Sequence, residues 1–334
     1  MSNLLALENL QTTFRTREGE VHAVRGVSFQ VKPGEVVGIV GESGCGKSVT
    51  CKSIIQLLGS NGRITGGSIR FQNEDLAQKT PAQMRAIRGN EIAMIFQDPM
   101  TALNPVLTIG KQMTEILMRN KGLTKKAAKA AAIAMLEKVG IAGAERRYDQ
   151  YPHEFSGGMR QRVMIAIALS CNPKLLIADE PTTALDVTIQ AQILRLLKSL
   201  QQQTRTAILL ITHDLGVVAQ VCSRVVVMYG GLVMEEGSVE DIFYRPAHPY
   251  TQGLLASLPR PDEVNQRLSP IEGSPPGLLN PPPGCPFAER CPKRMPQCER
   301  QPAFYAAGEG HRAACWLWAD KEAGYGPTRR FRHE

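Results

Sequence analysis

No apolar run in the 334-residue sequence approaches the roughly 20 residues that a helix needs to span a bilayer. The N-terminus does not have the pattern of a signal peptide, because the acidic residue Glu8 follows soon after a short run of leucines. These two absences argue against an integral membrane protein and a secreted one. We therefore expect a cytoplasmic protein.

The basic residues do not gather in one block. The formal net charge is +8, which on its own would suit nucleic acid or an anionic membrane face. Because the lysines and arginines are scattered, solvation and the phosphates of a nucleotide account for the excess as well. We expect no nucleic-acid partner.

Internal repeats and low-complexity tracts are also lacking, apart from a proline-rich stretch over residues 259–283. The chain exceeds the length at which one hydrophobic core usually stops growing, so one large domain with an appendage, or two domains, is expected. The change in composition predicts a domain over residues 1–258. Residues 259–334 would form a proline-rich arm that buries little core.

The eight cysteines form two groups. Four are scattered, which favours reduced thiols, and four crowd the arm, namely Cys285, Cys291, Cys298 and Cys315. The closely spaced C-x₂₋₄-C pairs typical of zinc sites are missing there, whereas four thiolates also suit a [4Fe–4S] cluster. A cluster, a zinc site and unliganded thiols remain open on the residues alone.

The strongest chemical signal is the stretch Gly41-Glu-Ser-Gly-Cys-Gly-Lys47-Ser48. The apolar run 36–40 before it predicts a buried strand, and residues 49–58 after it predict a helix. In that context the pattern G-x-x-x-x-G-K-[ST] binds phosphate. The alternative is an ordinary glycine-rich turn, which would show the whole pattern by chance in only about one chain in a hundred.

The residue types of this phosphate loop fit a nucleotide. Its glycines let backbone N–H groups close on a phosphate, and the helix N-terminus adds its positive dipole end. Lys47 would reach the β- and γ-phosphates, and Ser48 would hold Mg²⁺. The expected backbone contacts are at Gly41, Ser43, Gly44, Cys45 and Gly46.

Three further apolar segments predict core strands, and polar residues follow each of them. The segments are 92–96 before Gln97, 175–178 before Asp179 and Glu180, and 207–211 before His213. Ligands bind at the carboxyl ends of such strands in α/β sheets. Because neighbours on a strand point opposite ways, we assign Asp179 to Mg²⁺ and Glu180 to the attacking water. His213 would face the γ-phosphate.

The remaining segments complete the expected fold. Short strands at 4–7, around 13–14 and at 21–31, with a hairpin over 61–77, predict a small antiparallel sheet. Strands at 225–228 and 232–234 would complete the core sheet. Residues 109–139 have a helical pattern that stops at Gly140, and we interpret residues 99–170 as a helical subdomain.

Some candidate site residues also have ordinary structural explanations. Ser156 before Gly157 and Gly158 offers free donors to an anion at a helix start, although many helices begin in this way. Phe14 could stack on a purine ring or be a half-buried strand aromatic. Asp186 precedes a predicted helix and could simply cap it.

Taken together, these residues resemble the ATP-binding subunits of ABC transporters in order and spacing, over residues 4–258. Gly41 to Ser48 resemble the Walker A motif of that family, and Leu175 to Glu180 resemble its Walker B motif. Gln97 resembles the glutamine of its Q-loop, and His213 resembles its switch histidine. Phe14 corresponds to its adenine-stacking aromatic residue, and Asp186 to the acid of its D-loop. The resemblance implies an α/β fold, a P-loop ABC-type nucleotide-binding domain. It would combine a RecA-like core sheet, an antiparallel β subdomain and a helical subdomain, followed by the C-terminal extension.

The family signature Leu-Ser-Gly-Gly-Gln appears here as Phe155-Ser-Gly-Gly-Met159. The donors to a γ-phosphate come mainly from Ser156, Gly157 and Gly158, which remain. The altered form, the stretch 245–251 and the C-terminal cysteines are similar to the dipeptide and oligopeptide importer branch, with the nickel importers nearby.

The resemblance implies an ATP-hydrolysing motor that drives the uptake of dipeptides or oligopeptides at the cytoplasmic face of the inner membrane. Its partners would be a second, related ABC ATPase subunit in a heterodimer, two membrane permease subunits and an extracytoplasmic peptide-binding protein. Lys47, Gln97, Glu180 and His213 would be catalytic, with Mg²⁺ on Ser48, Gln97 and Asp179.

The cysteine spacing is similar to that of peptide importer ATPases that carry a [4Fe–4S] cluster. This resemblance favours a cluster over a zinc site, and both over unliganded thiols. We expect a structural role, because the cysteines lie far in sequence from the ATP residues.

Two other classes fit less well. Soluble ABC ATPases that act on ribosomes or DNA usually fuse two ATPase halves or insert a long coiled coil, whereas this chain has one phosphate loop and a short insertion. If the chain were a P-loop kinase or a GTPase, the presence of Ser156-Gly157-Gly158 and of His213 would be unexplained. The solute stays open between dipeptides, longer peptides and a metal chelate.

Overall fold

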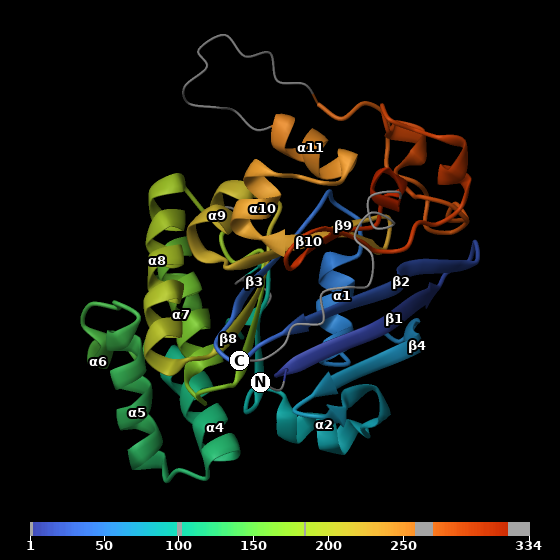
Figure 1. Ribbon diagram of the computed structural model, residues 1–334. Helices are drawn as coiled ribbons and strands as arrows, with labels where there is room; N and C mark the ends of the chain where they lie inside the picture. Colours follow the sequence, from blue (N-terminus) through green and yellow to red (C-terminus); the bar gives the residue numbers. More distant parts are fainter. Residues whose placement is uncertain (1–2, 99–101, 184, 258–269, 320–334) are drawn as a thin grey trace, which may run out of the picture.

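The computed structural model describes residues 3–98, 102–183, 185–257 and 270–319. Two sheets form the centre of this part of the chain. The helices α4 (Ile109–Lys121), α5 (Lys125–Lys138) and α6 (Ala144–Arg147) lie at one end, and the C-terminal segment lies at the other (Figure 1). Sequence segments far apart are therefore brought together on the central sheets.

The smaller sheet is antiparallel, with the order β2-β1-β4-β5. Its strands are β1 (Leu5–Arg15), β2 (Glu20–Val31), β4 (Gly62–Phe71) and β5 (Glu74–Asp75). The sequence predicted two short strands where the structure has the single strand β1. The strand continues through the polar pair Glu8-Asn9 because the pairing is irregular there, with Asn9 at a φ of 50° and its N–H donated to Ser28 Oγ.

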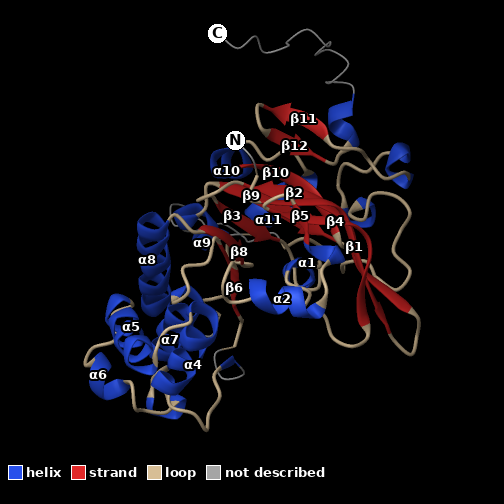
Figure 2. Ribbon diagram, turned by 90° about the horizontal axis from the view of Figure 1, so that it is seen from below, coloured by secondary structure: helices blue, strands red, loops and turns tan. Residues whose placement is uncertain are grey.

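The larger sheet has the order β11-β12-β10-β9-β3-β8-β7-β6 (Figure 2). Its parallel part consists of β6 (Ile92–Ile95), β7 (Leu175–Asp179), β8 (Ala207–Ile211), β3 (Val36–Val40) and β9 (Arg224–Tyr229). β3, β7 and β8 are buried at every position, as continuous apolar strands covered on both faces should be. The predicted core strands are confirmed.

The larger sheet extends beyond residues 232–234, which were predicted to be its last strand. After β10 (Leu232–Ser238) come β12 (His311–Ala313) and β11 (Tyr305–Gly308), both antiparallel. Strands this short carry too little hydrophobic periodicity to be recognised from sequence.

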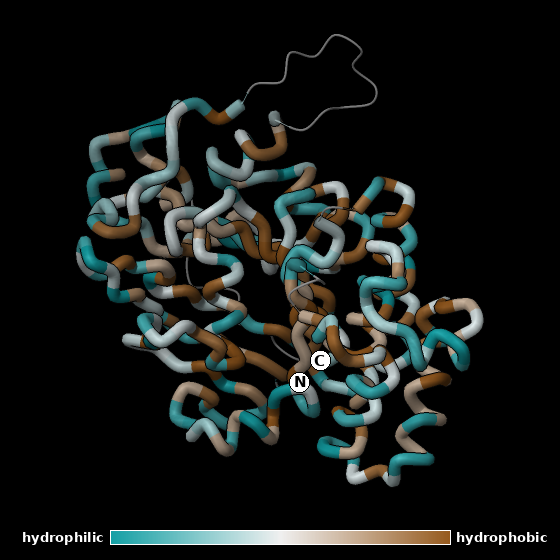
Figure 3. Tube along the Cα trace, turned by 180° about the vertical axis from the view of Figure 1, so that it is seen from behind, coloured by the Kyte–Doolittle hydropathy of each residue, from teal (hydrophilic) through white to brown (hydrophobic). Residues whose placement is uncertain are grey.

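Helices cover both faces of the larger sheet. One face packs against α1 (Lys47–Ile54), and the other against α7 (Gly157–Leu169) and α8 (Val187–Thr204). Along β3, Val36 faces the α7 side and Val37 faces the α1 side, as strand alternation requires. The hydrophobic stretches accordingly gather in the interior of the trace (Figure 3).

The stretch 109–139 is helical as predicted, but it forms two helices. Gly122, at a φ of 65°, ends α4, and Thr124 accepts a hydrogen bond from Ala127 N to begin α5. The shorter helices are α2 (Pro81–Ile87), α9 (Leu215–Val221), α10 (Val239–Tyr244) and α11 (Pro249–Ala256). No helix within the described ranges is long and apolar enough to cross a membrane.

The C-terminal segment buries more apolar side chains than expected. Phe287 is 1% exposed and shares a hydrophobic cluster with Val40 and Tyr229. The described end of the proline-rich stretch, residues 270–283, contacts β2, where His22 N donates to Leu278 O and Arg25 Nη2 donates to Pro282 O. The expectation that this arm buries little core is therefore wrong, since it packs on the core sheets. The division at residue 258 stays a prediction, and residues 258–269 lie outside the described ranges.

Candidate nucleotide-binding and catalytic site

The phosphate loop joins the end of β3 to the start of α1, as predicted. Gly41 has a φ of 149°, and a Cβ there would lie 2.1 Å from Met228 O. Gly46 has a φ of 101° at the N-cap of α1, and a Cβ there would lie 2.5 Å from Ala23 O. Only glycine fits this backbone at both positions, which gives the spacing of the motif a physical cause.

Lys47 lies inside this loop. Its Nζ donates to Gly41 O at 2.7 Å and to Glu42 O at 2.9 Å, and the residue is 6% exposed. The loop thus holds a positive charge among its own backbone groups. That charge, together with the start of α1, suits a polyphosphate.

Ser48 and Asp179 meet although 131 positions separate them. Ser48 Oγ donates to Asp179 Oδ1 at 2.8 Å. Asp179 is 3% exposed, and burial raises the pKa of its carboxyl, while the Ser48 hydrogen bond and nearby lysines oppose that rise. A hydroxyl beside a carboxylate is a ligand pair that Mg²⁺ accepts. The structure brings these two predicted residues together.

Glu180, Gln97 and His213 form a second group. Glu180 Oε2 accepts from Gln97 Nε2 at 3.0 Å, and Glu180 Oε1 lies 3.2 Å from His213 Nδ1. The three residues follow the adjacent parallel strands β7, β6 and β8, whose carboxyl ends share one edge of the sheet. The arrangement can hold and orient a water beside a phosphate.

Asp179 and Glu180 are not separated by strand alternation, contrary to the prediction from the sequence. Asp179 is the last residue of β7, and Glu180 lies beyond the strand at a φ of 48°, in the left-handed region. A backbone turn, and not strand alternation, gives the two carboxylates different surroundings.

Thr183 was missed by the sequence analysis. Its hydroxyl donates to Glu180 Oε2 at 2.9 Å. The only available signal was a hydroxyl three residues after an acid at a turn, which is too common a pattern to single it out.

The signature residues lie across the sheet from the phosphate loop. Ser156 Oγ accepts from Met159 N at 3.4 Å as the N-cap of α7, and a Cβ on Gly158 would lie 2.7 Å from Ile189 of α8. α7 and α1 lie on opposite faces of the sheet (Figures 1 and 2). These residues therefore form a separate candidate anion site.

Phe14 and Asp186 have clear local roles. Phe14 is half-buried in β1, and a Cβ on Gly62 would lie 2.6 Å from its ring. Asp186 caps α8 by accepting from Ile189 N at 2.9 Å. Both structural alternatives are thus present, and a nucleotide role for either residue stays a prediction.

The four arm cysteines converge in space. All four are free thiols, and burial followed by the charges of the other thiols raises the pKa of Cys285, to about 11. Burial also raises the pKa values of Cys291 and Cys315, with smaller contributions from neighbouring cysteines, Cys298 in both cases. Within the described ranges, however, no three His, Cys, Asp or Glu side chains are arranged so that they could hold a metal ion.

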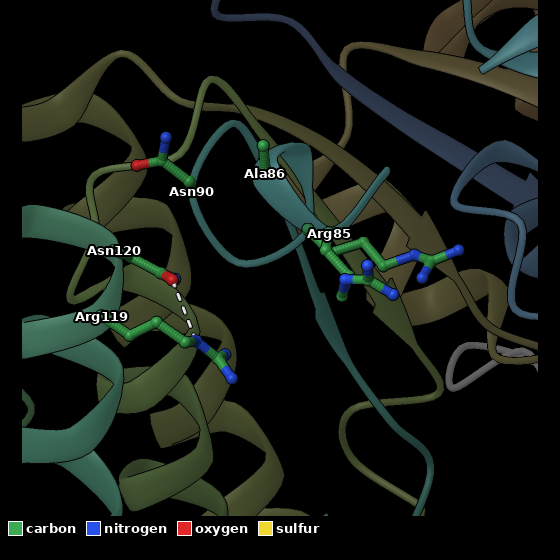
Figure 4. A pocket seen from close by; sticks show the side chains of 6 residues that line it. Arg85, Ala86, Asn90, Arg119 and Asn120 are labelled. Atoms are coloured by element: carbon green, nitrogen blue, oxygen red, sulfur yellow. Dashed lines mark hydrogen bonds between the residues drawn. The ribbon is translucent and has the colours of Figure 1, made fainter. Parts of the chain in front are cut away.

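A basic groove lies between α2 and α4. Arg85, Arg88, Asn90, Arg119 and Asn120 line it, with no acidic residue among them (Figure 4). The guanidinium of Arg88 is held by Ile55 O and Gln56 O, whereas Arg85 and Arg119 are exposed. A neighbouring pocket shares Arg88, Arg119 and Asn120 with this groove and is also lined by Met94 and Phe96, which lie just before Gln97 in the chain.

This fold and this site define an ATPase of the ABC transporter class. The family described as ABC transporter matches residues 24–183. The structure is similar to a dimeric ATP-binding cassette, MJ0796, in a post-hydrolysis state bound to ADP and Pi. The TM-score is 0.64 at 29% identity, covering 70% of this chain and 98% of that one.

The C-terminal part of the chain and its sequence relatives identify the branch of the ABC transporter family. The family described as the C-terminal region of oligopeptide/dipeptide transporters matches residues 234–298. The chain is 56% identical to the dipeptide transport ATP-binding protein DppD of Bacillus subtilis, over 95% of each chain. It is 50% identical to the oligopeptide transport ATP-binding protein OppD of Haemophilus influenzae, over 96% of this chain and 99% of that one. The chain belongs to the family of ATP-binding subunits of dipeptide and oligopeptide ABC transporters, which confirms the resemblance.

Proposed function

We propose that this chain is the ATP-hydrolysing motor of an importer for dipeptides or oligopeptides. The observation that carries the proposal is the grouping of Gln97, Glu180 and His213 at the edge of the sheet that also holds Ser48 and Asp179. The relatives named for dipeptide and oligopeptide transport support the substrate class.

Each residue has a defined task in this proposal. Lys47 and the backbone of the phosphate loop bind the phosphates of ATP, and Glu180 accepts the proton of the attacking water. Gln97 and Thr183 orient the Glu180 carboxylate, and His213 lies beside it. Mg²⁺ on Ser48 and Asp179, with Gln97 nearby, would neutralise phosphate charge.

We infer that the site is completed by a second, related ATPase subunit. Ser156, Gly157 and Gly158 lie on the opposite face of the sheet from Lys47, so they suit the γ-phosphate bound by a partner. The dimeric state of the similar cassette supports this arrangement. Phe14 and Asp186 would contact the adenine and the partner, respectively. We propose that the partner is a different chain. Co-purification of this chain with a related ATPase subunit tests the proposal.

The basic groove is our proposed docking site for a permease subunit. It lies between α2 and α4, and the exposed Arg85 and Arg119 would contact acidic side chains or backbone carbonyls of the permease (Figure 4). We place the complex at the cytoplasmic face of the inner membrane, with an extracytoplasmic binding protein delivering the peptide.

We further propose that the four arm cysteines hold a [4Fe–4S] cluster. Their convergence supports a shared ligand, because four cysteines gathered in one segment can bind the same group as thiolates. A single tetrahedral zinc with Zn–S bonds of ~2.3 Å needs sulfurs only about 3.8 Å apart. The absence of such a compact group within the described ranges weighs against zinc more than against the larger cluster. The cluster would cross-link the arm; no catalytic step passes through it.

The proposal is tested by ATP turnover in reconstituted membranes that contain the permease subunits. We expect peptide-loaded binding protein to raise turnover and peptide to accumulate inside the vesicles. Turnover that responds to nucleic acid and not to the loaded binding protein would contradict it.

A further inference from the structure

The C-terminal segment contacts the phosphate loop directly. Arg290 ends the short turn Ala288–Arg290, and its Nη1 lies 2.7 Å from Oε2 of Glu42, the second residue of the loop. The side chains are 7% and 23% exposed, respectively. This is a largely buried ion pair between positions 248 residues apart, so the arm contacts the phosphate loop although the two are far apart in sequence.

Arg290 is held from several other sides. Its Nη1 also donates to Tyr229 OH at 3.0 Å, its Nε to Glu272 O at 2.8 Å and its Nη2 to Ile271 O at 3.0 Å. Burial alone would lower the pKa of Arg290, but the hydrogen bonds to Glu42 and Tyr229 outweigh burial and raise it. The guanidinium is therefore a fixed positive charge whose position is set by the arm.

The backbone of Glu42 is also tied down. Its N–H donates to Tyr250 OH at 2.8 Å. Tyr250 is fully buried, with its ring centroid 4.5 Å from that of Tyr229 and 5.3 Å from that of Phe287 in the arm. Both the side chain and the backbone of Glu42 are thus fixed by groups that lie after β3 in the chain.

The carboxylate of Glu42 would repel the phosphates of a nucleotide bound by the loop. It brings a carboxylate into a loop whose proposed ligand carries several negative charges, and like charges in a partly buried site repel over several ångströms. The Lys47 ammonium contacts the backbone carbonyl of Glu42. Arg290 supplies a positive charge at hydrogen-bond distance from the carboxylate itself.

We propose that Arg290 is a positioning residue of the nucleotide site, whose charge neutralises Glu42 at the phosphate loop, so that the C-terminal segment sets the affinity of the loop for ATP. This inference rests on the proposed ATP-binding role of the loop. It gives the arm a function in nucleotide binding.

The test measures the Kd for MgATP of the full-length chain by calorimetry, for the wild type and a set of variants. Arg290→Ala should raise Kd by about tenfold or more, a difference of about 1.4 kcal/mol. Glu42→Gln should stay within about twofold of the wild type, and the double variant should recover to within about threefold, because the unpaired carboxylate is gone. Arg294→Ala changes an exposed arginine of the same segment and should have no effect.

Each outcome has a distinct meaning. A normal Kd for Arg290→Ala, with binding lost in Lys47→Ala, overturns the inference and leaves the proposed function intact. Normal binding by Lys47→Ala overturns the proposed function itself. A weakened Arg290→Ala that Glu42→Gln does not rescue also overturns the inference, because the loss then stems from folding and not from charge. Arg290→Gln, which keeps donors without the charge, provides the same test if the alanine variant does not fold.

Discussion

The amide nitrogen of Gln97 lies 3.0 Å from Oε2 of Glu180, across 83 positions of sequence. The bond joins the proposed general base to the segment at the end of β6, where Met94 and Phe96 line a pocket together with Arg88, Arg119 and Asn120. A shift of that segment on docking would therefore move the carboxylate that faces the water. We propose this contact as the route by which a docked permease subunit acts on Glu180.

Lys47→Ala should abolish ATP binding. The substitution removes the buried ammonium of the phosphate loop, and we expect affinity to fall on the order of 100-fold because charge-assisted contacts to the phosphates are lost. Fluorescent ATP-analogue binding measures the change. Lys198→Ala, at an exposed lysine of α8, serves as the control and should bind normally.

Reversing the charge of the basic groove should uncouple the motor. Arg85→Glu combined with Arg119→Glu places like charges against the acidic or carbonyl groups of a permease, so stimulation by loaded binding protein should drop about tenfold or more. Basal turnover of the isolated chain should not change, since neither residue contacts the ATP site. Arg195→Glu, on α8, is the matched control, and equal stimulation in all variants would refute the docking site.

The cysteine proposal predicts a definite metal content. Protein purified without oxygen should contain about four irons and matching acid-labile sulfide per chain, and Cys285→Ser should lose them. Cys171→Ser, at a buried cysteine outside the arm, should keep them. Zinc, or no metal, in the wild type would remove the cluster and leave the ATP site untouched.

His248 predicts a pH dependence of stability. Burial lowers its pKa to about 4, against the smaller opposing effect of the Glu235 charge. In the unfolded chain the histidine pKa is about 6.5, so below about pH 6.5 the unfolded chain binds a proton that His248 in the folded chain does not bind. The free energy of unfolding therefore falls as the pH drops below about 6.5. The expected loss is about 2 kcal/mol between about pH 7 and about pH 5.

Chemical denaturation at the two pH values measures this loss. His248→Asn keeps an oxygen to accept from Tyr250 N at the start of α11, and its stability should depend less on pH. An unchanged pH dependence in the variant would show that other groups cause it.

The sequence was most informative where a signal is local. The apolar strands, the glycines of the phosphate loop and the polar residues after three strands are all short-range patterns, and they located Ser48, Gln97, Asp179 and Glu180 correctly at one sheet edge. The pair formed by Arg290 and Glu42 could not be found in this way, because nothing in the residues around Arg290 indicates a partner 248 positions away.

Backbone conformation was the other limit. Glutamate rarely adopts a positive φ, so nothing in the sequence indicated that Glu180 leaves the strand. The short strands β11 and β12 and the burial of Phe287 depend on contacts made across the whole chain.

The most direct test of the ATP motor is the Glu180→Gln variant. Glutamine keeps the size and hydrogen-bonding capacity of the side chain but cannot take the proton of the attacking water, so turnover should fall on the order of 100-fold or more. The Kd for ATP should stay within about threefold of the wild type. Turnover that remains near the wild-type rate would contradict the role of Glu180 and the catalytic account built on it.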